Sequence, residues 1–115
     1  MLESDIQEFV VNYLRIVYPK VLYCASAGGM RTSMRQAIKM KRTGYVKGVP
    51  DLQIFEPRGD YHGLLLEIKT KKGVASPEQK EWIELLNKRG YKAIICKGTD
   101  ECMKAIDDYF NEAPR

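Results

Sequence analysis

Two charged residues interrupt an apolar run in the middle of the chain. The segment from 64 to 69 reads Leu-Leu-Leu-Glu-Ile-Lys, which is typical of a strand covered on both faces except at Glu67 and Lys69. These two residues are two positions apart, so their side chains leave the same face of the strand. Because burying an unpaired carboxylate or ammonium group is costly, we expect both charges to be paired, to be solvated at a cleft or to contact a metal ion.

A third charged residue, Asp51, precedes a neighbouring apolar run. Residues 52–55 predict a second strand, and residues 56–60 have the composition of a turn between antiparallel strands. If Gly59 is the centre of this turn, Asp51 and Glu67 are each 8 residues from it and lie opposite one another. Cross-strand neighbours have Cβ atoms about 4.5–5.5 Å apart, so the two carboxylates can share one cation. A bulge or a longer loop would instead shift the pairing by one residue.

The expected cation is hard and divalent. Carboxylate oxygens of Asp51 and Glu67, the backbone carbonyl of Ile68 and water molecules suit Mg²⁺ or Mn²⁺ better than zinc. Such an ion polarises a phosphodiester and lowers the pKa of a bound water. Lys69 can orient that water or stabilise the charge of the transition state. These residues therefore predict metal-dependent hydrolysis of a phosphodiester.

The same residues resemble a known arrangement. An aspartate followed at a distance by Glu-X-Lys on the adjoining strand is similar to the motif of the PD-(D/E)XK nuclease superfamily. A fuller pattern runs over about the whole chain and consists, in order, of Glu3-Ser4-Asp5-Ile6-Gln7, a glycine-containing loop, Gly44, Gly48-Val49-Pro50-Asp51, Glu67-Ile68-Lys69 and Ser76-Pro77-Glu78-Gln79. This pattern resembles the stand-alone form of the VRR-NUC (virus-type replication-repair nuclease) domain.

This resemblance implies a fold, an activity and a set of roles. The residues that would be catalytic are Glu3, Asp51, Glu67 and Lys69, with Gln79 supporting the site. The resemblance also implies a restriction-endonuclease-like α/β core and a homodimer that cuts four-way (Holliday) junctions or other branched DNA during repair. Two roles have simpler explanations, because Glu3 can complement a helix dipole and Gln79 can cap a helix at Ser76.

Charge is distributed unevenly along the chain. The net charge is +4 and the pI is about 9.0, yet no Asp or Glu occurs between Phe9 and Pro50. The basic residues in that stretch are Arg15, Lys20, Arg31, Arg35, Lys39, Lys41, Arg42 and Lys47. Four of them recur at helical spacing along the segment 32–42, namely Arg31, Arg35, Lys39 and Arg42. We expect this basic stripe to contact DNA phosphates, although a solvated helix face has the same pattern.

Further candidate DNA contacts flank the predicted site. Residues 25–29 are small, so Ser26 and its neighbours can let a phosphate approach the backbone, or they can form a plain connection. Lys47 precedes the Pro-Asp pair, and Lys71 and Lys72 follow the Glu-Ile-Lys strand. We therefore include Ser26, Lys47, Lys71 and Lys72 among the predicted DNA-binding residues.

Length and composition limit the other possibilities. With 115 residues, 44% of them hydrophobic, we expect one domain over residues 1–115. The apolar runs are too short for a membrane span, and we expect no secretory leader. Cys24, Cys96, Cys102 and His62 support neither a disulfide framework nor a zinc site, and we expect Cys24 and Cys96 in the core. Free thiols favour a cytoplasmic protein, either bacterial or made by a phage and acting in its host.

The hydrophobic pattern predicts a mixed four-stranded sheet flanked by helices. The predicted segments are a helix over 3–17, a strand over 21–24, the basic helix over 32–42, strands over 52–55 and 64–69, a helix from 76 to 90, a strand over 91–96, a helix over 99–110 and a tail over 111–115. The helix between the last two strands is long enough for a parallel crossover.

A non-catalytic nucleic-acid-binding module on the same fold is the alternative to a nuclease. Intact Asp51, Glu67 and Lys69 argue against it. A module that only binds DNA has no need of two carboxylates facing a polyanion. Cleavage of branched DNA in the presence of Mg²⁺ or Mn²⁺ distinguishes the two functions.

Overall fold

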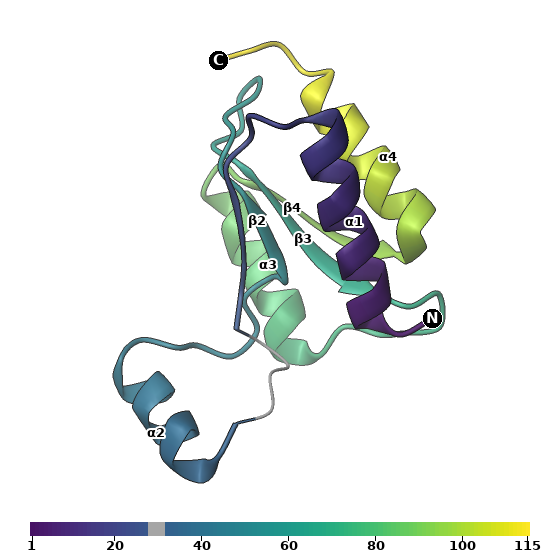
Figure 1. Cartoon of the computed structure of the whole chain (residues 1–115). Helices are drawn as coiled ribbons and strands as arrows, with labels where there is room; N and C mark the ends of the chain where they lie inside the picture. Colours follow the sequence, from purple (N-terminus) through teal and green to yellow (C-terminus); the bar gives the residue numbers. More distant parts are fainter. Residues whose placement is uncertain (28–31) are drawn as a thin grey trace.

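The computed structural model describes residues 1–27 and 32–115, which form a mixed sheet with helices on both faces. The elements follow the predicted order: α1 (Glu3–Val17), β1 (Tyr23–Ala25), α2 (Met34–Arg42), β2 (Leu52–Ile54), β3 (Leu64–Lys69), α3 (Pro77–Lys88), β4 (Lys92–Lys97) and α4 (Gly98–Phe110). Figure 1 shows α1 and α4 on one face of the sheet and α3 on the other, while α2 projects from one end. The predicted α/β fold is confirmed.

The strands pair in the order β1-β2-β3-β4. Strand β2 is antiparallel to both of its neighbours, β1 and β3. Strands β3 and β4 are parallel and are joined through α3. Leu52 pairs with Leu66 and Ile54 with Leu64, so the next position in this register places Asp51 opposite Glu67. The register that was predicted from the position of Gly59 is therefore confirmed.

The core lies between the sheet and the layer formed by α1 and α4. Apolar residues recur every fourth position along α1, at Ile6, Val10 and Leu14, and all three are buried. They pack with the buried leucine and isoleucine side chains of β3 and with buried residues of α4. Asp107 of α4 accepts hydrogen bonds of 2.7 Å from the hydroxyls of Tyr13 and Tyr18, which ties the two helices together. In the described part of the chain, no helix has the length and apolarity needed to cross a membrane.

The first strand and its cysteine differ from the prediction. Strand β1 begins at Tyr23 instead of residue 21, because residues 23–25 are those that pair in register with β2. Cys24 is exposed, so the prediction that it lies in the core is wrong, whereas Cys96 is buried as expected. The physical reason is that β1 is a three-residue strand at the edge of the sheet. An apolar run at an edge need not be covered.

Two other boundaries are set by local hydrogen bonds. Helix α2 begins at Met34 instead of residue 32, because the hydroxyl of Ser33 accepts a hydrogen bond from the Gln36 N–H and caps the helix. The predicted tail is docked, since the Gly59 N–H donates to the Ala113 carbonyl over 2.6 Å. The C-terminal residues therefore close over the β2–β3 turn.

Candidate active site

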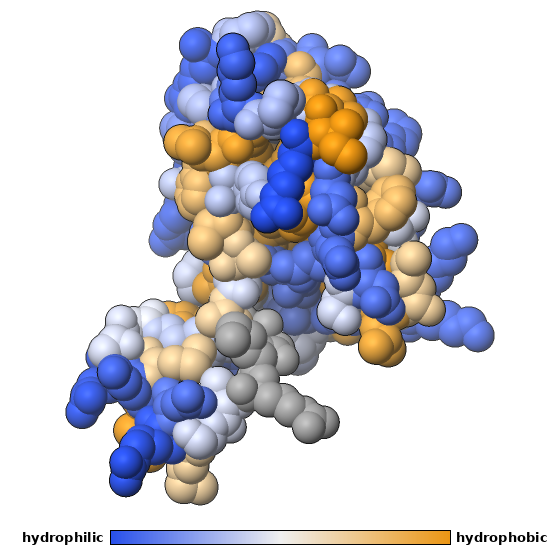
Figure 2. Space-filling view, in the orientation of Figure 1, coloured by the Kyte–Doolittle hydropathy of each residue, from blue (hydrophilic) through white to orange (hydrophobic). Residues whose placement is uncertain are grey.

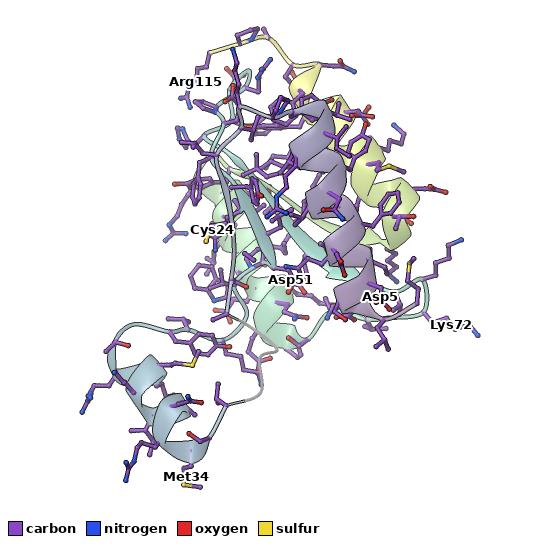
Figure 3. The ribbon with its side chains drawn as sticks, in the orientation of Figure 1. Asp5, Cys24, Met34, Asp51, Lys72 and Arg115 are labelled. Carbon is purple, nitrogen blue, oxygen red and sulfur yellow. The ribbon has the colours of Figure 1, made fainter. Side chains whose placement is uncertain are left out.

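The two acids of the hairpin meet at the end of the sheet where β2 begins. Glu67 lies within β3 and is 1% exposed, while Asp51 is half-buried immediately before β2. The Oδ2 atom of Asp51 accepts a hydrogen bond of 2.8 Å from the N–H of Ile68, which holds the aspartate across β3. Figure 3 shows Asp51 at this end of the sheet, between α1 and α3. The hairpin thus brings together the acids that were predicted to act as a pair.

Glu67 is a buried carboxyl group whose two oxygens accept no hydrogen bond from the described residues. Burial and the neighbouring Asp51 raise the pKa of Glu67 to about 8, against a smaller lowering effect of Lys69. Buried polar atoms are rarely left unpaired unless a ligand or an ion completes them. The pair of acids is therefore suited to a cation.

Lys69 links the hairpin to the first helix. Its Nζ atom lies 3.6 Å from Oε2 of Glu67 and 3.9 Å from Oε2 of Glu3, and the residue is 8% exposed. Glu3 is the first residue of α1, so the N-terminus of that helix is held over the end of β3. The structure places Glu3, Glu67 and Lys69 together. This arrangement fixes the ammonium group beside the acids.

A cavity of about 490 Å³ opens beside these residues. Its walls include Glu3, Ser26, Asp51, Glu67 and Gln79, which are five of the predicted site residues. The N–H of Ser26 donates to the Asp51 carbonyl over 2.9 Å, while its buried hydroxyl has no partner among the described residues. This hydroxyl is free to donate to a ligand in the cavity.

Gln79 combines the two roles that the sequence allowed. Its Oε1 atom accepts a hydrogen bond of 2.8 Å from the N–H of Ser76, as a capping box requires. The same residue lines the cavity. The helix cap thus fixes the glutamine at the cavity wall, and the cap bond leaves its amide nitrogen available as a donor.

Residues that were not assigned to the site also line this cavity. Ser4 and Gln7 extend the wall along α1 from Glu3, and Tyr45 extends it toward α2. Gln7 is four residues after Glu3, so the two share one face of the helix. That spacing could have identified Gln7 as a site residue from the sequence. From its place after the basic helix, Tyr45 could be expected to stack on a base or simply to pack, but no pattern placed it at this cavity, because its position depends on the course of the chain between α2 and β2.

The predicted DNA-binding residues lie in several places. Arg35, Lys39 and Arg42 are exposed on α2, and Figure 2 shows hydrophilic side chains over this projecting helix. Lys47 lines the cavity, and its Nζ atom lies 3.9 Å from Oε1 of Glu78. Two residues, Lys71 and Lys72, are exposed in the loop after β3, and Figure 3 shows Lys72 beyond the N-terminal end of α1, away from Asp51. Arg31 lies outside the described residues.

The acids available to a metal ion are few. Across residues 1–27 and 32–115, no group of three or more His, Cys, Asp or Glu side chains converges in a way that could hold an ion. Three acids, Glu3, Asp51 and Glu67, line the cavity, and Glu3 and Glu67 also contact Lys69. The backbone carbonyl of Ile68 stays a predicted ligand. Any ion held here would keep several water ligands, as Mg²⁺ commonly does.

Comparison with known proteins assigns the family. The model of the VRR-NUC domain matches residues 7–100. A solved structure described as a VRR_NUC domain protein is 35% identical and covers 99% of this chain and 92% of its own, with a TM-score of 0.86. A second, described as a VRR_NUC domain, shares the fold at 21% identity and a TM-score of 0.62, covering 93% of this chain and 96% of its own. Among curated proteins, none matches significantly. The chain therefore belongs to the VRR-NUC domain family and has its nuclease-type fold.

Proposed function

We propose that this chain is a Mg²⁺- or Mn²⁺-dependent DNA endonuclease that cuts branched DNA. The observation that carries the proposal is the pairing of the half-buried Asp51 with the buried Glu67, whose two oxygens accept no hydrogen bond from the described residues. A module that only binds DNA gains nothing from two acids facing a polyanion. The pair becomes useful when a cation joins the acids to a phosphate.

The chemistry of the donors fits a hard divalent ion. The oxygens of Asp51 and Glu67 would hold it, together with the carbonyl of Ile68. When bound, such an ion supplies Lewis acidity and lowers the pKa of a coordinated water. One of the two Asp51 oxygens is already fixed by the Ile68 N–H at 2.8 Å, so the carboxylate is oriented before anything binds. This preorganisation supports the assignment.

The remaining site residues supply donors and positioning. Lys69 donates toward the phosphate or the attacking water, and its contacts with Glu3 and Glu67 hold it in place. The hydroxyl of Ser26 and the amide nitrogen of Gln79 face the same cavity and are suited to phosphate oxygens. Arg35, Lys39 and Arg42 on α2 provide sequence-independent attraction to the DNA backbone.

Selectivity for branched DNA and a homodimer are the finer parts of the proposal. One chain of 115 residues presents little surface for choosing a substrate, and pairing two copies would give two sites at a four-way junction. The family assignment supports DNA as the substrate. An apparent mass close to 13.2 kDa, that of one chain, on a sizing column at working concentration would contradict the proposed homodimer.

A substrate panel tests the activity. The purified protein is incubated with linear duplex, single strand, flap, splayed arm and four-way junction, each with Mg²⁺, Mn²⁺ or EDTA. We expect cleavage of the branched substrates with either metal ion and none with EDTA. Binding of DNA without cleavage of any substrate under all conditions would favour the non-catalytic module instead.

A further inference from the structure

A second cavity adjoins the catalytic one. Its volume is about 610 Å³, and it lies between α2 and the segment that follows it. Tyr45, Val46 and Lys47 line both cavities, so the two share a wall. We propose that the second cavity binds one unpaired nucleotide of the DNA, next to the phosphodiester that is cut. This inference rests on the proposed nuclease function and narrows its substrate to DNA with an unpaired nucleotide at the branch.

The wall of the cavity has the composition of a base-stacking surface. Ala37, Met40, Tyr45 and Val46 supply methyl groups, a thioether and an aromatic ring. Aromatic side chains stack on any base, because every base has a π-face, and methionine adapts to irregular apolar shapes. The volume lies within the range of about 300–1,000 Å³ that is usual for small-molecule sites.

The backbone holds Tyr45 close to α2. Gly44 has a φ of +113°, a conformation that side chains disfavour, and it reverses the chain directly after the helix. The N–H of Tyr45 then donates to the Met40 carbonyl over 2.8 Å. Tyr45 is half-buried as a result. The cavity wall is thus built by a defined turn and is in place before any ligand binds.

The charges around the cavity favour a nucleotide over an apolar peptide. Lys41 and Lys47 line it and are exposed, and the chain from residue 9 to residue 50 carries no Asp or Glu. A base placed against Tyr45 would have the phosphates on either side of it within a cationic surface. An apolar segment of another protein would bring no negative charge to Lys41 or Lys47, of which only Lys47 has an acidic neighbour among the described residues, Glu78.

The paired bases of a duplex cannot enter such a cavity. A base reaches a stacking pocket of this kind only when it is single-stranded or flipped out of the helix. Because the cavity shares three residues with the catalytic one, the unpaired nucleotide would lie close to the scissile phosphate. Flaps and splayed arms offer such a nucleotide at the branch point, whereas a fully paired four-way junction must first unpair one.

The test compares two substrates in EDTA, so that binding is measured without cleavage. One is a flap with a single 2-aminopurine as the unpaired nucleotide at the branch, and the other is a fully paired four-way junction of the same length. We expect the wild-type protein to quench the 2-aminopurine. Tyr45→Ala should lose the quenching and lower the flap-to-junction affinity ratio on the order of tenfold, while Tyr45→Phe should keep both.

Tyr91→Ala is the matched control. Tyr91 is half-buried like Tyr45 but lies before β4, against His62, with ring centroids 5.4 Å apart. The control should leave the quenching and the affinity ratio as in the wild type. An unchanged ratio in a folded Tyr45→Ala variant, or equal losses in both alanine variants, would overturn the inference.

Cleavage by the wild-type protein separates this inference from the proposed function. If Mg²⁺ or Mn²⁺ supports cleavage but Tyr45→Ala keeps the wild-type substrate preference, the nuclease proposal stands and the nucleotide pocket is rejected. If quenching depends on Tyr45 but no DNA is cut, the pocket stands and the catalytic proposal is rejected.

Discussion

Two regions carry the charges that the proposed reaction needs, and they hold them in opposite ways. On β3, Glu67 and Lys69 are 1% and 8% exposed within a strand that is buried along its whole length. On α2, Arg35, Lys39 and Arg42 are exposed, and none of the nine residues of that helix, all of them described, is buried. The first region fixes a few charges at a high desolvation cost, because they are buried. The second presents several charges to solvent with almost no desolvation cost.

The difference teaches which property each region contributes. Buried charges are held by the register of the hairpin and by hydrogen bonds such as that from Ile68 to Asp51, so their geometry is set before substrate arrives. Exposed lysine and arginine side chains on a projecting helix have no fixed geometry, and they attract any polyanion. Substitutions in β3 should therefore affect chemistry and folding, and substitutions in α2 should affect affinity alone.

The largest effect is expected from removing a charge at the hairpin. Asp51→Ala, Glu67→Ala and Lys69→Ala should each lower the cleavage rate more than about a thousandfold, because they remove the cation's ligands or the ammonium group beside them. DNA binding in EDTA should persist, since α2 is untouched. The measurements are single-turnover cleavage and an equilibrium binding titration. Wild-type cleavage by all three variants would refute the site.

Removing an apolar side chain should destabilise the protein much more on β3 than on α2. Leu66 is fully buried in β3, and Leu66→Ala should lower the free energy of unfolding by about 2–5 kcal/mol. Ile38 on α2 is 60% exposed, and Ile38→Ala should change it by less than about 0.5 kcal/mol. Urea denaturation followed by circular dichroism measures both. Similar losses in the two variants would mean that α2 is packed in solution in a way that the structure does not show.

The same contrast explains how much could be predicted from the sequence. The pairing of Asp51 with Glu67 could be predicted, because a period of two and a turn at Gly59 fix a register by arithmetic alone. The exposure of Cys24 could not, since an apolar run does not reveal whether its strand lies at the edge of the sheet. Nor could the second cavity, because it arises from the packing of Tyr45 against a helix of low apolar content.

The buried acid predicts a pH effect in the metal-free protein. Glu67 has a pKa of about 8 in the folded protein and about 4.5 in the unfolded chain, so the folded state binds the carboxyl proton more tightly. The contribution of this proton to the stability of the fold is complete below pH 4.5 and is lost as the pH rises to 8. Over that window, the free energy of unfolding should fall by up to about 1.4 kcal/mol per pH unit.

Glu67→Gln isolates this effect. The variant should lack this part of the pH dependence and be more stable than the wild type at pH 8, because no carboxyl group has to ionise in the core. Urea titrations in EDTA at a series of pH values measure it. The Glu84→Gln variant, which changes a carboxylate whose side chain is 67% exposed, is the control and should follow the wild type. A Glu67→Gln curve parallel to that of the wild type would count against the buried acid.

The basic helix should affect affinity without affecting stability. Arg35→Ala with Lys39→Ala removes two phosphate contacts, which should weaken DNA binding and reduce the slope of log K against log salt by up to about 1.8. Lys88→Ala with Lys104→Ala removes the same charge from two exposed side chains outside the site and is the matched control. Fluorescence anisotropy at several salt concentrations measures the slopes. Equal slopes in the two double variants would mean that α2 does not contact DNA phosphates and is only a solvated helix face.

The smallest effect should come from Gln79, where one residue serves both folding and the site. Gln79→Ala and Ser76→Ala each break a bond of the cap on α3, at 2.8 Å and 3.2 Å respectively, and each should lower stability by about 1 kcal/mol. Only Gln79→Ala also removes an amide from the cavity wall. Its cleavage rate should therefore fall several-fold below that of Ser76→Ala at the same stability. If the two variants cut equally well, capping alone accounts for Gln79, because the cap is the one interaction that they lose in common.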